Sequence, residues 1–238
     1  MNLLRFIPKD IKRRFRERAG AVTLEGRLRN LRRAGFIPRV VVDAGAFRGE
    51  WTREVLPIFP EAEFLLIEPQ SSVRPALRSL ADENKNIRLR HHLLGRVAGE
   101  VRMLVEGSNS RILPSGFEAP PGAALESHRI ETLAEALAAE GFQSCDLLKL
   151  DLQGHELEAL AGAGDLFGRI EVIMCEVSWL RIGDVPILHE VVAEFVARGY
   201  RPYDVLGQNY RRLDRALWQT DVLFVREDSV LLASNSWS

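Results

Sequence analysis

The segment Val40-Val-Val-Asp-Ala-Gly-Ala-Phe-Arg-Gly49 indicates the class of fold. Its three β-branched residues predict a short buried strand. The two glycines predict a turn after that strand, because glycine lets the backbone bend sharply and approach a neighbour closely. A helix is predicted over residues 50–56, and it ends before Pro57. A strand, a glycine turn and a helix in this order are typical of an α/β domain.

The rest of the chain repeats this alternation. Further strands are predicted at residues 63–68, 87–91, 100–105, 146–151, 170–177, 200–205 and 221–225, and further helices at 71–83, 133–140, 156–161 and 187–198. The pattern predicts one doubly wound, mostly parallel sheet of the Rossmann-like kind, with helices on both faces.

Two connections depart from the alternation. The strand at 87–91 is expected to join the strand at 100–105 through a turn at 95–99. No helix separates the last two strands, which predicts an antiparallel hairpin at one edge of the sheet. Residues 107–124 are rich in Gly, Pro, Ser and Ala and predict a long surface loop, a candidate lid.

Composition is that of a soluble globular protein. The chain has 238 residues, of which 46% are hydrophobic and 27% charged. No apolar run approaches the roughly 18 residues that a membrane-spanning helix needs, and the first six residues are too short an apolar stretch for a secretory signal. Cys145 and Cys175 both lie in apolar stretches, which is typical of buried thiols in a reducing compartment and not of a disulfide or metal site. A cytoplasmic setting is predicted.

Charge is concentrated at the start of the chain. Residues 1–33 carry eleven Lys or Arg against three acids, a net +8 in a chain whose formal net charge is −1. We therefore expect a basic helical segment over residues 1–35, followed by a single domain over 36–238. The favoured interpretation is a solvated helix that packs its apolar residues on the domain; weak contact with a membrane surface is the alternative. Aromatic residues do not alternate with the basic ones, so no nucleic-acid partner is predicted.

Polar residues follow three of the predicted strands. They are Asp43 and its glycine turn, Glu68-Pro69-Gln70, and the stretch from Lys149 to Glu156. Ligands of such folds bind beyond the carboxyl ends of the strands, near the point where the strand order reverses. A carboxylate at Glu68 can accept hydrogen bonds from both hydroxyls of a ribose. Together these features predict a cofactor that contains adenosine.

Two common nucleotide motifs are missing. A dinucleotide site needs Gly-x-Gly-x-x-Gly, and counting from Gly45 this chain has Phe47 and Glu50 where the later glycines belong. The phosphate-binding Gly-x-x-x-x-Gly-Lys-Ser/Thr motif does not occur either. Asp-x-Gly-x-x-x-Gly followed by a distant acid instead resembles the first two motifs of class I S-adenosylmethionine-dependent methyltransferases.

Further stretches resemble the FkbM-type methyltransferase family. They include residues 42–49, 68–69, 129–133, 148–163, 173–176 and 221–226, in the order of that family. The block from Lys149 to Glu158, Lys-Leu-Asp-Leu-Gln-Gly-His-Glu-Leu-Glu, is the most specific part. Phe47 is a departure, since the family usually has Asn there. The resemblance implies O-methylation, by S-adenosylmethionine, of a hydroxyl on a small acceptor such as a sugar, a glycolipid or a natural product.

The resemblance also implies a set of cofactor-binding residues. They are Asp43, Gly45, Ala46, Phe47, Gly49, Glu68, Pro69, Gln70 and Asp151. Asp43 and the amides near Gly45 and Gly49 are expected at the methionine end, and Glu68 at the ribose. Each has a structural alternative: Asp43 as the cap of a turn, and Glu68 as a solvated strand end.

Catalytic roles are expected at Asp151, His155 and Glu156, and acceptor contacts at Glu176 and Trp179. An imidazole can take the hydroxyl proton during transfer, yet a lone histidine is more often structural. Asp151 and Glu156 have the alternative of helix N-terminal carboxylates, and Trp179 that of core packing. A second oxygen ligand near Asp151 is not evident, so no metal is predicted.

Two other functions remain open at this level. One is a nucleotide-dependent oxidoreductase of similar fold, against which the missing dinucleotide motif argues. The other is a protein that binds an adenosyl ligand without catalysis. The acceptor and the oligomeric state are not defined by the sequence.

Overall fold

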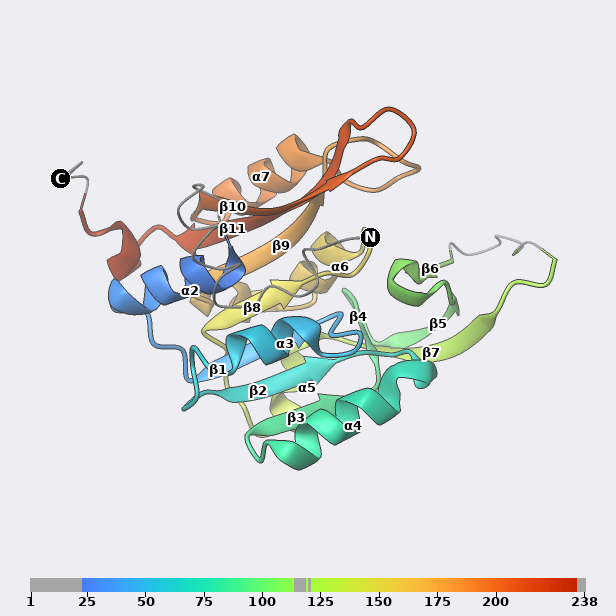
Figure 1. Ribbon diagram of the computed structural model, residues 1–238, viewed down its shortest axis with the longest axis horizontal. Coiled ribbons are helices and arrows are strands. Elements are labelled where there is room, and N and C mark those ends of the chain that lie inside the picture. Colours follow the sequence, from blue (N-terminus) through green and yellow to red (C-terminus); the bar gives the residue numbers. More distant parts are fainter. Residues whose placement is uncertain (1–22, 114–118, 120, 235–238) are drawn as a thin grey trace, which may run out of the picture.

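The computed structural model describes residues 23–113, 119 and 121–234, and its centre is a seven-stranded sheet (Figure 1). The strand order is β10-β11-β9-β8-β1-β2-β3. The five strands from β9 to β3 are parallel, and β11 is antiparallel to both β9 and β10. The strands are β1 (Val40–Ala44), β2 (Glu63–Ile67), β3 (Ile87–Arg90), β8 (Leu147–Leu150), β9 (Val172–Ser178), β10 (Tyr200–Tyr210) and β11 (Leu217–Arg226). The predicted doubly wound sheet with an antiparallel edge hairpin is confirmed.

Helices cover both faces of this sheet. They are α2 (Leu24–Arg33), α3 (Glu50–Val55), α4 (Arg74–Glu83), α5 (Leu133–Ala139), α6 (Glu156–Ala161) and α7 (Leu188–Ala197). One buried cluster joins the sheet to α2, α3 and α4, and the other joins it to α5, α6 and α7. Alternate residues of β1 show why: Val41 belongs to the first cluster and Val42 to the second, because successive side chains of a strand point to opposite faces.

A second, smaller sheet was only partly predicted. It consists of β4 (Leu93–Leu94), β5 (Gly99–Leu104), β6 (Arg111–Ile112) and β7 (Leu125–Glu131), in the order β4-β7-β5-β6. The expected direct turn from the strand at 87–91 to the strand at 100–105 is wrong, because β4 lies between them: β3 stays in the main sheet beside β2, while β5 pairs with β7. Residues 107–124, expected to be a loop, contain a 3-10 turn at Gly107–Asn109 and strand β6.

Helix α2 is the described part of the basic N-terminal segment. Thr23 caps it by accepting the Gly26 N–H at 3.1 Å, and Leu28 and Leu31 are buried in the core. Leu24 packs against the same core, whereas the apolar residues of the segment before Thr23, such as Ile11 and Phe15, lie outside the described residues. Within the described ranges, no helix combines the length and the apolar composition needed to cross a bilayer.

Candidate functional site

The turn between β1 and α3 needs glycine at Gly45. Its φ is +81°, and a Cβ added there would lie 1.9 Å from the carbonyl oxygen of Asp151. A side chain is therefore excluded, and the turn packs directly on the loop after β8. Phe47 also has a positive φ of 45°, which costs a non-glycine residue free energy. The Phe47 N–H donates to Oε2 of Glu68 at 2.9 Å, and this bond helps to hold the strained turn.

Glu68 lies just beyond the end of β2 and is 3% exposed. Its Oε1 accepts the Gln70 N–H at 2.9 Å, while its Oε2 accepts from Phe47. Burial raises the pKa of Glu68, although both backbone donors oppose the shift. Each carboxylate oxygen can accept a further hydrogen bond, so the fixed carboxylate offers two acceptors to a ligand.

A cavity of about 1000 Å³ opens beyond the carboxyl ends of the parallel strands. It lies where β1 stands between β8 and β2, the point at which the strand order reverses. Its wall near β1 and β2 includes Gly45, Ala46, Phe47, Trp51, Glu68, Pro69 and Gln70. Its opposite wall includes Lys149, Asp151, Gln153, His155, Glu176, Asn209, Tyr210, Trp218, Gln219 and Asp221.

The small sheet closes another side of the cavity. Leu93, Leu94, Met103, Ser110 and Ile112 line it. The Ser110 hydroxyl donates to Oε1 of Gln70 at 3.0 Å, which ties the segment after the 3-10 turn to the turn after β2. The predicted surface loop therefore begins with residues that form part of the cavity wall.

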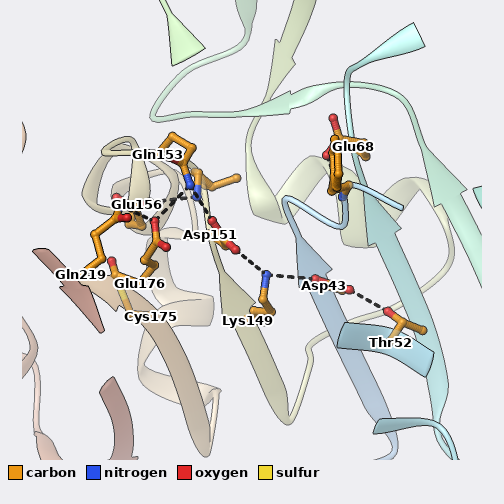
Figure 2. Close-up of polar contacts among 12 residues, drawn as sticks. Asp43, Thr52, Glu68, Lys149, Asp151, Gln153, Glu156, Cys175, Glu176 and Gln219 are labelled. Carbon is orange, nitrogen blue, oxygen red and sulfur yellow. Dashed lines mark hydrogen bonds and ion pairs between the residues drawn. The ribbon is translucent and has the colours of Figure 1, made fainter. Parts of the chain in front are cut away.

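A chain of polar contacts runs across the sheet beneath the cavity (Figure 2). At one end, the Thr52 hydroxyl donates to Oδ2 of Asp43 at 2.6 Å. Lys149 Nζ lies 3.5 Å from Oδ1 of Asp43 and 3.1 Å from Oδ2 of Asp151. The ammonium thus bridges the carboxylates of two neighbouring strand ends, and it lies 6.0 Å from the centre of the Trp51 ring.

The same chain continues toward β9 and β11. Gln153 Nε2 donates to Oδ1 of Asp151 at 3.0 Å and to Oε2 of Glu176 at 3.1 Å. Gln219 Nε2 donates to the same Glu176 oxygen at 2.8 Å. Gln153 reaches both carboxylates from a backbone with φ +53°. Two side-chain amides therefore fix Glu176 at the wall of the cavity.

Burial and repulsion between nearby like charges shift the pKa values of the acids in this chain of polar contacts. Burial raises the pKa of Asp43, while Lys149 and Thr52 oppose the rise. Burial, then Asp151, Glu156 and Asp221, raise the pKa of Glu176 to about 9. Burial raises the pKa of Asp221 to about 6. For Lys149, the nearby acids outweigh burial and raise the pKa, so its charge is retained.

Most predicted site residues line the cavity, but four do not. Asp43 is fully buried beneath it, and a Cβ on Gly49 would meet the side chain of Leu80 at 2.7 Å. Glu156 Oε1 accepts the N–H groups of Leu152 and Gly154 at 2.8 and 3.1 Å. Trp179, the fourth, is 41% exposed. The ligand-binding roles expected for these four stay predictions, and their present contacts are structural.

His155 lines the cavity on the loop before α6. Burial lowers its pKa, against a smaller opposing effect of Glu158. The imidazole is therefore neutral near pH 7 and able to accept a proton.

The sequence did not single out Lys149, Gln153, Gln219 or Asp221 as site residues. Lys149 and Asp151 share a face of one strand because they are two residues apart, and this spacing could have identified the pair. Gln219 and Asp221 have the same two-residue spacing on β11. The residues of β9 that lie beside them, Ser178 and Glu176, follow only from the register of β11 against β9.

No group of three or more His, Cys, Asp or Glu side chains within the described ranges is arranged to hold a metal ion. Asp151 is instead paired with the ammonium of Lys149 and accepts a hydrogen bond from the amide of Gln153. Glu176 accepts hydrogen bonds from the amides of Gln153 and Gln219.

The stability of the protein is expected to fall as the pH rises from about 5 to about 9. Folded Glu176, with a pKa near 9 against a usual 4.5, keeps a proton in this range that the unfolded chain releases. Its stabilising contribution is full below pH 4.5 and is lost as the pH rises through 9. Between pH 7 and pH 9, urea unfolding should show a loss of ~2 kcal/mol from this group. Glu176→Gln should flatten the curve between pH 7 and 9; an unchanged slope in that variant would show that Glu176 does not titrate this way.

Comparisons with known proteins bear on the family and the fold of the chain. Residues 43–202 match the model of the methyltransferase FkbM domain. The structure is similar to that of methyltransferase FkbM from Methylobacillus flagellatus KT, with 18% identity and a TM-score of 0.52 over 79% of this chain and 43% of that one. This chain thus spans less than half the length of that protein. It is also similar to ribosomal protein L11 methylase from Lactobacillus delbrueckii subsp. bulgaricus, with 13% identity and a TM-score of 0.47 over 85% and 78% of the two chains.

A search of the curated proteins finds no match to this chain. The family model covers most of the chain, from Asp43 near the end of β1 to the start of β10. Its range includes Glu68 and the block from Lys149 to Glu158 that suggested the resemblance. The chain therefore belongs to the FkbM methyltransferase domain family.

Proposed function

We propose that this protein is an S-adenosylmethionine-dependent O-methyltransferase that acts on a hydroxyl of a small acceptor, a sugar, a glycolipid or a natural product. The observation that carries the proposal is the pairing of the glycine turn after β1 with the fixed carboxylate of Glu68 in one cavity. Membership of a methyltransferase family supports the reaction class.

The cavity wall near β1 and β2 fits an adenosine cofactor. Glu68 has two carboxylate oxygens with free acceptor capacity in a cavity that Gly45, Ala46 and Phe47 also line. We assign the ribose hydroxyls to Glu68, the adenine side to Pro69 and Gln70, and the methionine end to the turn at Gly45. When bound, S-adenosylmethionine supplies an electrophilic methyl group on a sulfonium.

Residues of the opposite wall would serve the acceptor. Asp151 and Glu176 place carboxyl groups there that can form hydrogen bonds with the acceptor; Glu176, with a pKa near 9, is protonated near pH 7. His155 is proposed to accept the proton of the acceptor hydroxyl at a ring nitrogen, since burial keeps the imidazole neutral. Glu156, through the N–H groups of Leu152 and Gly154, would position the loop that carries His155.

Two further assignments remain proposals. Residues 36–238 would form the methyltransferase domain, with 1–35 as a separate basic segment. Cys145 and Cys175 are free and buried, and unpaired thiols support a reducing, cytoplasmic setting.

The test has a binding arm and a transfer arm. S-adenosylmethionine and S-adenosylhomocysteine should raise the melting temperature in thermal-shift assays, whereas NADH should not. Transfer of a tritiated methyl group to a panel of sugars and glycolipids should be detected. His155→Ala should lower turnover about 100-fold or more while calorimetry shows unchanged S-adenosylmethionine affinity.

Each arm can fail separately. Stabilisation by NADH alone would contradict the cofactor assignment. Binding of S-adenosylmethionine without transfer to any acceptor would favour the non-catalytic alternative. Full activity of His155→Ala would remove the proton-acceptor role from His155 and leave the methyltransferase proposal intact.

A further inference from the structure

Two loops meet at the mouth of the cavity. One is the tip of the β10–β11 hairpin, residues 210–218, and the other follows β9, residues 179–187. The Trp179 N–H donates to the carbonyl oxygen of Trp218 at 2.7 Å, and Ile182 and Leu213 both line the cavity. Figure 1 shows the hairpin tip and the loop after β9 projecting together beyond the end of the sheet.

These loops expose large apolar side chains. Leu213 is 82% exposed, Ile182 52%, Tyr210 43% and Trp179 41%. Scattered single apolar residues are normal on a protein surface, but a group of them at one site indicates an interaction surface. Tyr and Trp are amphipathic side chains that favour the boundary between water and an apolar phase.

Arginines lie beside the apolar residues of the hairpin tip. Residues 210–218 carry Arg211, Arg212 and Arg215 against one acid, Asp214. Arg211 pairs with Asp214, and Arg215 lies over the Tyr210 ring at 5.7 Å. Arg212 is exposed and forms no ion pair with any residue that the structure describes. The hairpin tip therefore keeps an excess of positive charge beside its exposed leucine.

We propose that this mouth surface, formed by Trp179, Ile182, Tyr210, Leu213 and Arg212, docks onto an anionic phospholipid bilayer. Apolar side chains on projecting loops can enter the headgroup region, and arginines beside them attract anionic lipids.

Docking in this way brings the open cavity against the bilayer, so the acceptor hydroxyl belongs to a lipid-linked head group. This consequence rests on the proposed methyltransferase function, whereas the docking itself does not.

The test is co-sedimentation of the full chain with vesicles. Binding is expected to phosphatidylcholine vesicles that contain phosphatidylglycerol, and to be weaker with phosphatidylcholine alone. Ile182→Ser with Leu213→Ser should weaken binding about tenfold or more, because both side chains lose their apolar contact with the lipid. The matched control, Ile37→Ser with Val230→Ser, changes two side chains that are 65% and 56% exposed, one before β1 and one after β11, at the opposite end of the strands, and should bind like the wild type.

A second pair of variants tests the charge. Arg212→Gln should lose much of the preference for phosphatidylglycerol, while Arg39→Gln, at the amino end of β1 and 85% exposed, should keep it. No vesicle binding by the wild type, or equal binding by all variants, would overturn the proposal; the second result would place lipid contact on another part of the chain. Calorimetry with S-adenosylmethionine on the same samples separates these failures from failure of the proposed function.

Discussion

Replacing Glu68 by glutamine should weaken S-adenosylmethionine binding about 30- to 100-fold. A hydrogen bond to a charged group contributes ~1.5–3 kcal/mol, and in our account the carboxylate receives two from the ribose. The amide of glutamine keeps the shape of the side chain but only one acceptor oxygen. In the wild type the N–H groups of Phe47 and Gln70 both donate to the carboxylate. In the variant, the NH₂ group of the glutamine would have to face one of these donors. Isothermal titration calorimetry measures the change directly.

Glu63→Gln provides the matched control for this prediction. Glu63 begins the same strand, β2, at the end of the strand away from the cavity, and its side chain forms a 3.6 Å ion pair with Arg88. The affinity of this variant should equal that of the wild type. Equal affinities for Glu68→Gln and Glu63→Gln would remove Glu68 from the cofactor site.

Replacing Lys149 by methionine should lower the free energy of unfolding by about 3–5 kcal/mol, the usual result of breaking a buried ion pair. The ammonium is 6% exposed and lies between Asp43 and Asp151. Without it, among the residues that the structure describes, the fully buried Asp43 keeps only the hydroxyl of Thr52 as a partner. Urea unfolding at neutral pH measures the loss.

Lys85→Met is the control for this prediction, because Lys85 is exposed in the turn before β3; its stability should change by less than ~0.5 kcal/mol. Adding Asp43→Asn to Lys149→Met should recover part of the loss, since the neutral amide no longer needs a buried cation. A loss below ~1 kcal/mol in Lys149→Met would show that the ammonium does not hold the strand ends together.

The local sequence was sufficient to predict the strand and the turn at the centre of the fold. The β-branched run before Asp43 and the glycines after it define a strand and a turn through residues that are neighbours in the chain. Glu68 was found the same way, at the end of the next predicted strand. Parallel strands bring such ends to one edge, so the sequence could place the two groups in one site before any coordinates were known.

Pairing between distant segments could not be read in the same way. Strand β7 has the sequence Leu-Glu-Ser-His-Arg-Ile-Glu, in which only His128 and Glu131 are buried, so hydrophobic alternation gives no signal. Gln219 joins the site because β11 pairs with β9 in a register that sets Gln219 beside Ser178. Register across sequence-distant strands depends on the assembled sheet.

Phe47 shows a different limit of prediction from the local sequence. Its identity departs from the family pattern. In the structure, Phe47 has a positive φ, and its N–H donates a hydrogen bond to the Glu68 carboxylate. A residue that is unfavourable on local grounds is tolerated because the surrounding contacts hold it. Arg48 adds to them, with its guanidinium 5.3 Å from the centre of the Phe47 ring.

The most direct measurement is a crystal structure of the protein with S-adenosylhomocysteine. Our account predicts the nucleoside in the cavity, both ribose hydroxyls within hydrogen-bond distance of the Glu68 carboxylate, and the amino-acid end against the turn at Gly45. The sulfur should face the wall that holds Asp151 and His155. A nucleoside bound elsewhere, or one whose ribose does not contact Glu68, would contradict the account.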